Sequence, residues 1–155
     1  MNKTVGLITF HASHNHGSVL QAYATQQSIL KLGHNCEIIN FRMPSQKNYY
    51  SLYGARHDWA LKIRKALLLS YHFQRKQRAA KFETFLRERL ICTPEYNSYD
   101  DLKGAPTYDV YVSGSDQIWS PSIPEFALSD VDYTGVYFLD FTDGRKVAYA
   151  SSIGE

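Results

Sequence analysis

The sequence predicts an α/β fold with an open, mostly parallel sheet and helices on both faces. Residues 4–10 and 35–41 are short, apolar and rich in β-forming residues, so both are expected to be buried strands. A helical pattern lies between them, and a strand, a helix and a second strand within about forty residues form a βαβ unit, which implies parallel pairing. A third strand is expected at residues 109–113, directly before a polar turn.

The first helix should follow a polar turn at residues 11–18. Its apolar residues fall on one helical stripe: Val19, Leu20, Tyr23, Ala24 and Leu30. Gly33 comes directly after Lys31 and Leu32 and is a natural stop for this helix. The helix therefore returns the chain to the start of the second strand.

The middle of the chain should contain two helices after an irregular connection at residues 42–56. The first is expected at about residues 58–72. The second carries apolar residues that share one face: Ala79, Phe82, Leu86 and Leu90. Ser98 is then placed to cap a short turn that runs through residue 102.

The C-terminal third should add two more strands, at residues 137–141 and 146–151, joined by a turn at residues 142–144. The third strand should end in a sharp turn at residues 114–117. Residues 120–134 contain two prolines and several small or acidic residues, so they are expected to form a loop.

Composition excludes several classes of protein. Apolar residues make up 44% of the 155 residues, which argues against disorder. The sequence contains no run of about 18 apolar residues, so no membrane span is predicted. The N-terminus also lacks the pattern of a signal peptide. Cys36 and Cys92 are far apart and outside any Cys-x-x-Cys motif, so neither a zinc site nor a disulfide framework is predicted. A cytoplasmic location, with membrane association as an option, is expected.

Charge is unevenly distributed. Residues 56–90 carry ten basic and three acidic side chains, net +7, whereas residues 91–155 carry three basic and eleven acidic ones, net −8. The basic segment could attract a membrane surface or an anionic polymer, and the alternative is a pair of solvated helical faces. No nucleic-acid partner is predicted.

Two polar segments are expected at the carboxyl ends of strands, where open α/β sheets bind ligands. The first segment is residues 11–18, in which Gly17 would let the backbone turn and let a ligand approach closely. The following helix start would offer unpaired N–H groups. Gln21 lies opposite the apolar stripe. The alternative interpretation of this segment is simple capping, in which Asn15 or Ser18 satisfies the N–H groups of the helix start. His11, His14 and His16 lack a nearby carboxylate, so no metal site is predicted.

The second polar segment is GSDQIW at residues 114–119. Asp116 could accept a proton from a sugar hydroxyl or hold that hydroxyl by a hydrogen bond, and the alternative is a tight turn capped by Asp116. Ser115 lies outside any Gly-x-Ser-x-Gly motif, so it is not predicted to be a nucleophile. Trp119 is expected to pack rather than to bind sugar. Glycine fingerprints for dinucleotides and nucleoside triphosphates are absent from the sequence.

Three segments in this order resemble the signatures of the polysaccharide pyruvyl transferase family. They are NHGSVLQAYA at residues 15–24 after a strand ending near Phe10-His11, GSDQIW at 114–119, and FLDF at 138–141 followed by AYASSIG at 148–154. The resemblance covers residues 3–154, with the basic stretch as its variable part. One departure is His16, where the family usually has an aromatic residue.

The resemblance implies transfer of a pyruvyl group from phosphoenolpyruvate, as co-substrate and without a cofactor, to a sugar of a cell-surface glycan or its lipid-linked precursor. It also implies one Rossmann-like half of a GT-B-like, two-domain architecture, whose second domain binds the donor through arginine and histidine residues. On that basis residues 1–155 are expected to be a single N-terminal domain without the donor-binding domain, and inactive alone. The alternatives are a non-catalytic glycan-binding or interaction module and another GT-B-like glycosyltransferase domain.

These considerations give a specific set of expected site residues. Asp116 is the expected catalytic residue. The expected substrate-binding residues are His11, Asn15, Gly17, Gln21, Gly114, Ser115 and Gln117. The strands that lead into the two polar segments should be parallel neighbours, so that both segments line one crevice.

Overall fold

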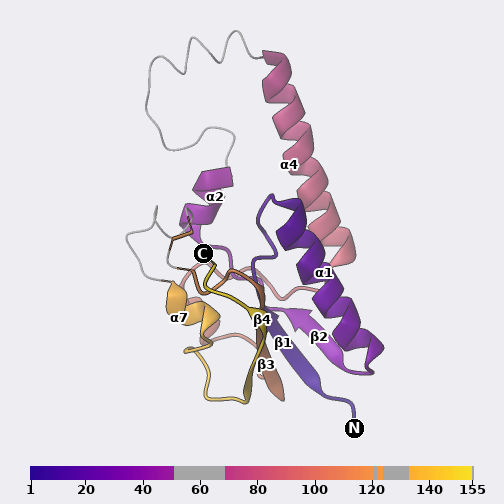
Figure 1. Ribbon diagram of the computed structural model, residues 1–155, viewed down its shortest axis with the longest axis vertical. Coiled ribbons are helices and arrows are strands. Elements are labelled where there is room, and N and C mark those ends of the chain that lie inside the picture. Colours follow the sequence, from indigo (N-terminus) through magenta and orange to yellow (C-terminus); the bar gives the residue numbers. More distant parts are fainter. Residues whose placement is uncertain (51–68, 121, 124–132, 155) are drawn as a thin grey trace.

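The computed structural model describes residues 1–50, 69–120, 122–123 and 133–154 (Figure 1). Its elements in chain order are β1 (Thr4–Ile8), α1 (His16–Lys31), β2 (Asn35–Ile38), α2 (Pro44–Tyr50), α4 (Leu69–Arg89), α5 (Tyr99–Leu102), β3 (Val110–Asp116), α7 (Thr134–Tyr137) and β4 (Lys146–Ser151). Strands and helices alternate along much of the chain, as the predicted fold class requires.

The four strands form one sheet in the order β2-β1-β3-β4, and every pairing is parallel. The predicted open parallel sheet is therefore confirmed. The prediction that β1 and β3 are neighbours is also confirmed, since Ile8 pairs with Ser113 at their carboxyl ends. Both polar segments consequently leave the sheet at the same edge.

Helices cover both faces of the sheet, as predicted. In Figure 1, α1 and α4 lie side by side against one face, and α7 and α2 lie on the other side. The first face has a core that joins the strands to α1 and α4: Val5, Leu7, Val19, Ala22, Phe82, Leu86 and Leu90. The second core joins the strands to α5 and α7: Ile8, Phe10, Leu102, Tyr111, Val136 and Tyr137.

The buried face of α1 differs from the predicted stripe. Val19 is buried, but Leu20 is 56% exposed and Ala24 is also exposed. Gln26 is fully buried instead, because its amide donates to Cys36 O and Ile91 O and accepts from Ile91 N. A hydrogen-bonded amide therefore occupies a buried position of α1 where an apolar side chain is usual. A search for apolar residues at helical spacing does not find such a position.

The middle of the chain needs two corrections. Within the predicted irregular connection, residues 44–50 form α2, with Pro44 at the first helical position, where proline is well tolerated. Of the predicted helix at residues 58–72, residues 58–68 lie outside the described residues, and residues 69–72 belong to α4. The predicted apolar face of the second helix is confirmed, with three of its members buried and Ala79 half-buried. Ser98 caps α5 as predicted, in a reciprocal arrangement with Asp101.

The C-terminal third needs two more corrections. The predicted strand at residues 137–141 is wrong, because α7 and a turn occupy that segment. Leu139 has a φ of 63°, which does not fit a strand. Tyr137 and Leu139 are buried in the core, whereas Phe138 between them stacks on Trp119. The predicted turn at residues 114–117 is also wrong in part, because β3 continues to Asp116. Beyond Ser113, Gly114 pairs with Tyr149 and Asp116 with Ser151 of β4.

Candidate functional site

A polar pocket of about 540 Å³ opens at the carboxyl ends of β3 and β4, beside the start of α1. Small and polar residues line it: Asn15, Gly17, Ser18, Gln21, Ser115, Asp116, Gln117, Ala150 and Ser152. Six of the eight sequence-predicted site residues are in this set, while His11 and Gly114 are not. The position matches the carboxyl-edge location where parallel sheets bind ligands.

The start of α1 forms one wall of the pocket. Asn15 is the N-cap, and its Oδ1 accepts a hydrogen bond of 2.8 Å from Gly17 N, so the capping role is confirmed. Gly17 lies within the first helical turn and does not have a left-handed φ, so it does not make the predicted backbone turn. Its missing side chain instead leaves room beside the helix start, where the N–H groups carry partial positive charge.

Gln21 ties this wall to the sheet. Its Nε2 donates to Thr9 Oγ1 at 2.8 Å, and its Oε1 accepts from the Ser115 hydroxyl at 3.1 Å. Thr9 is buried and follows β1, whereas Ser115 lies in β3. Because both ends of the amide are bonded, Gln21 holds the helix and the two strands at a fixed spacing.

Asp116 contributes the acidic group of the pocket. Its Oδ1 accepts a hydrogen bond of 2.8 Å from Gln117 N, which partly confirms the local capping role. Its Oδ2 is buried and has no hydrogen-bond partner among the described residues. A buried carboxylate oxygen without a donor is unfavourable, so a hydroxyl or cation that reached it would be bound strongly.

Gly114 lies beneath the pocket rather than in its lining. Its φ is +128°, and a Cβ atom added there would lie 2.0 Å from Tyr149 O in β4. Glycine is thus required at this position for close pairing of β3 with β4. Gly114 shapes the site through the backbone and need not contact a ligand.

His11 lies away from this pocket and is 1% exposed. Its ring nitrogens are 3.2 Å from Thr9 O and 2.9 Å from Asn40 Oδ1. Burial lowers the pKa of His11 below the ordinary value of 6.5, and the nearby Arg42 guanidinium also lowers it. The structure therefore gives His11 a place in a buried network that joins the ends of β1 and β2.

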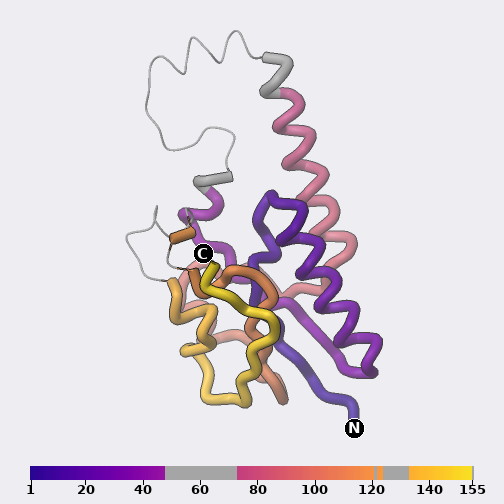
Figure 2. Tube along the Cα trace, viewed as in Figure 1, coloured from indigo at the N-terminus to yellow at the C-terminus, as the bar shows by residue number. Residues whose placement is uncertain are grey.

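The third wall was not predicted from sequence. Ala150 of β4 and Ser152 line the pocket, and Ser152 N donates to Asp116 O at 3.0 Å. In Figure 2 the C-terminal segment runs beside the segment that follows β3. The signal for this wall was present, because residues 146–151 were a predicted strand whose carboxyl end should reach the same edge.

The charge of the pocket is limited to Asp116, since none of its described lining residues is Lys, Arg or His. His14 and His16 point elsewhere: His14 Nε2 is 3.0 Å from Glu83 Oε1, and His16 packs on Phe82. Within the described ranges no group of three or more His, Cys, Asp or Glu side chains could hold a metal ion. A search of the same ranges finds no helix with the length and apolarity needed to cross a membrane.

Parts of all three signatures line this site, although FLDF at residues 138–141 does not. The segment 15–24 supplies the helix wall, 114–119 supplies Asp116, and 148–154 supplies the β4 wall. A family-wide sequence model described as polysaccharide pyruvyl transferase matches residues 15–155. The chain belongs to the polysaccharide pyruvyl transferase family. Neither curated proteins nor solved structures gave a match to this pyruvyl transferase-like chain.

Proposed function

We propose that this chain provides the acceptor side of a pyruvyl transferase, which transfers a pyruvyl group from phosphoenolpyruvate to a sugar of a cell-surface glycan or its precursor. The observation that carries the proposal is Asp116, which lines the polar pocket and whose buried Oδ2 has no hydrogen-bond partner among the described residues. Neutral hydroxyl and amide groups surround it. Such a lining suits a polyhydroxylated sugar, whose hydroxyls both donate and accept hydrogen bonds.

The chemistry assigns a role to Asp116. In pyruvyl ketal formation, two sugar oxygens bond to the central carbon of the donor, the methylene carbon gains a proton and phosphate leaves. Each attacking hydroxyl must also lose its proton. Asp116 is the acidic residue of the described lining and would accept that proton. The amide of Gln117 and the hydroxyl of Ser152 would orient the sugar ring beside it.

Donor binding would require groups from outside this pocket. Phosphoenolpyruvate carries a phosphate and a carboxylate, which proteins hold with convergent arginine, lysine or histidine side chains. The described lining offers none of these, and Asp116 would repel an anion. This observation favours one alternative function, a glycan-binding module that does not turn over the donor.

The sugar-binding part is tested by NMR titration of the chain with neutral methyl hexosides. We expect shifts at Gly17, Ser115 and Gln117, with affinity at least about tenfold lower in Asp116→Asn, because a charge-assisted hydrogen bond is lost. Asp143→Asn, an exposed carboxylate in the turn before β4, is the matched control and should bind normally. Shifts confined to other surfaces would overturn the pocket assignment.

The catalytic part is tested separately by measuring phosphate release. We expect the chain alone to release no phosphate from phosphoenolpyruvate, with or without a glycan, since the described pocket lacks anion-binding side chains. Release that requires both substrates and disappears in Asp116→Asn would show that this chain is active by itself. Sugar binding without any release would support the glycan-binding alternative.

A further inference from the structure

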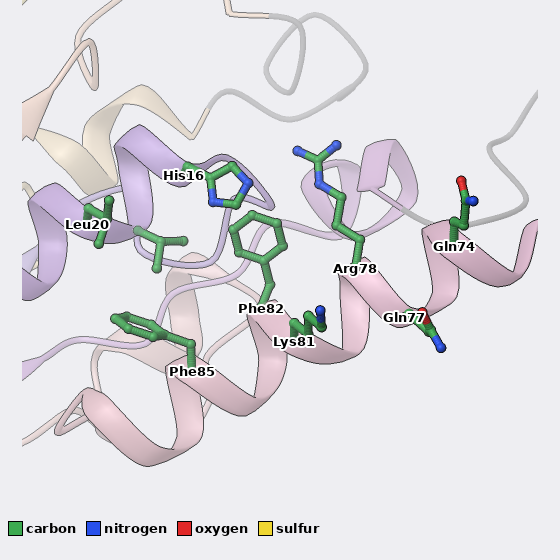
Figure 3. A pocket seen from close by; sticks show the side chains of 9 residues that line it. His16, Leu20, Gln74, Gln77, Arg78, Lys81, Phe82 and Phe85 are labelled. Carbon is green, nitrogen blue, oxygen red and sulfur yellow. The ribbon is translucent and has the colours of Figure 1, made fainter. Parts of the chain in front are cut away.

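A second pocket of about 380 Å³ lies between the start of α1 and the middle of α4 (Figure 3). His16, Val19 and Leu20 of α1 line one side. Residues from about three turns of α4 line the other: Gln74, Gln77, Arg78, Lys81, Phe82 and Phe85. We call this pocket the α1–α4 groove. It is within the range of volumes that bind small ligands.

The two ends of the α1–α4 groove differ in chemistry. Figure 3 shows Leu20, Phe82 and Phe85 gathered at one end, and Arg78, Gln74 and Gln77 at the other. Leu20 is 56% exposed, although it faces the apolar end. The groove therefore presents an apolar surface next to cationic and amide groups. This arrangement is complementary to an amphiphile with an apolar tail and an anionic head.

The cations at the polar end belong to a strongly basic half-helix. Residues 69–82 of α4 contain four basic residues and no carboxylate: Arg75, Lys76, Arg78 and Lys81. All four are exposed, as is Phe73 at 63%. In Figure 1 this half of α4 extends beyond α1, away from the sheet. A planar anionic surface could approach it without contacting the strands.

Two of these cations have different roles at the groove. Arg78 is held in place, because its guanidinium donates to His14 O at 3.2 Å and lies 5.6 Å from the centre of the Phe82 ring. Lys81 lines the same groove and is exposed to solvent. Its ammonium is thus available to an anion located over the groove.

We propose that the α1–α4 groove, with Lys81 and Arg78 at its polar end, docks this protein on an anionic lipid bilayer. One acyl chain of an anionic phospholipid would lie against Leu20 and Phe85, and its phosphate would be bound by Lys81 and Arg78. Combined apolar insertion and electrostatic attraction is how amphipathic surfaces bind membranes. An acidic soluble protein would pair with the cations of the groove. It would not supply an acyl chain to cover the exposed apolar end.

Docking of this kind would place the polar pocket near the membrane. The same first turns of α1 line both pockets, with Gly17 and Ser18 facing the polar pocket and Val19 and Leu20 facing the groove. A sugar at the polar pocket would then lie close to the bilayer surface. The docking proposal itself does not depend on the proposed pyruvyl chemistry.

The test measures partitioning of the purified chain onto vesicles of 70% phosphatidylcholine and 30% phosphatidylglycerol, at salt near 0.15 M. We expect binding that falls as salt rises and is absent with pure phosphatidylcholine vesicles. Lys81→Glu should weaken partitioning roughly 25-fold, since each nearby charge contributes about fivefold and the reversal changes two. The matched control is Lys76→Glu, which lies about 140° from Lys81 around the helix and should lose less than about fivefold.

The apolar end is tested with Leu20→Asn, which should weaken partitioning roughly tenfold. Its control is Leu32→Asn at the far end of α1, where Leu32 is 75% exposed, and this variant should partition normally. Unchanged thermal unfolding verifies that each variant is folded. Equal losses for Lys81→Glu and Lys76→Glu, or no effect of Leu20→Asn, would overturn the groove assignment. Binding to soluble polyanions but not to vesicles would overturn the proposal that the partner is a membrane. The assay contains no sugar or donor, so its failure leaves the proposed function untouched.

Discussion

The side chains of Gln21 and Ser115 share a hydrogen bond of 3.1 Å, although 94 positions separate them in the chain. This contact joins the first turns of α1 to the carboxyl end of β3, and both segments line the polar pocket. The same Gln21 side chain reaches Thr9 beyond β1. The Gln21 amide therefore links α1 to the ends of two neighbouring strands beside the pocket.

Gln21→Leu should lower the free energy of unfolding by about 1–3 kcal/mol, because it leaves the buried Thr9 hydroxyl without its donor. Gln27→Leu makes the same chemical change at another half-buried position of α1 and should cost less than about 1 kcal/mol. Urea unfolding of both variants measures the difference. Equal losses would show that the bridge does not stabilise the fold.

Gly114→Ala should destabilise the protein by about 3 kcal/mol or more, because φ is +128° and the new Cβ would overlap Tyr149 O. The change should also weaken pairing of β3 with β4, which amide exchange of β4 would report. In Gly104→Ala the new Cβ lies 3.5 Å from Asp101 O, an ordinary contact, and a small effect is expected. A stable Gly114→Ala variant would contradict the close strand approach.

Glu83 should make the free energy of unfolding depend on pH in the acidic range. Its pKa is lowered to about 2, chiefly by the hydrogen bond with His14 and further by the Arg42 guanidinium, while burial acts the other way. A lowered carboxyl pKa stabilises the fold above its ordinary value of 4.5, and this contribution is lost as pH falls from about 4.5 to about 2. The stability difference between the wild type and Glu83→Gln should therefore shrink across that range in urea unfolding. Glu88→Gln, at an exposed carboxylate of the same helix that pairs with Arg87, is the control for the loss of one charge from α4.

His11 should act in a higher pH range. Burial lowers its pKa below 6.5, so the folded state favours the neutral ring, and stability falls as pH drops below that value. His11→Gln, which can still bond Asn40, should flatten the stability profile below about pH 6.5. An NMR titration of the ring checks the cause directly. A ring that protonates at or above pH 6.5 would refute the explanation.

The sequence predicted the sheet and most of the residues that line the candidate pocket, because both depend on local patterns. Continuous apolar runs marked β1 and β2, and polar residues after strands marked Asn15 and Asp116. Parallel pairing then brought these residues together without knowledge of any side-chain contact. Each signature is likewise a short run of residues that can be identified without knowledge of the fold.

Tertiary contacts decided the parts that the sequence did not predict. Residues 137–141 alternate like a strand, but burial of Tyr137 and Leu139 against the second core and stacking of Phe138 on Trp119 favour a helical turn there. His11 resembled a polar loop residue, and only its contact with Asn40, which is 29 positions away, shows why it is buried. Patterns within a window do not contain such long-range partners.

The exposure of β4 has a consequence for the dynamics of the site. Residues 146–150 of this strand are all exposed, so β4 is held chiefly by its ladder with β3 and by little apolar burial. Strands of this kind open first in native-state exchange. The wall made by Ala150 and Ser152 is therefore expected to detach and reform more often than the α1 wall. A bound ligand that contacts both walls would be read out as slowed amide exchange along β4, even where it touches none of those amides.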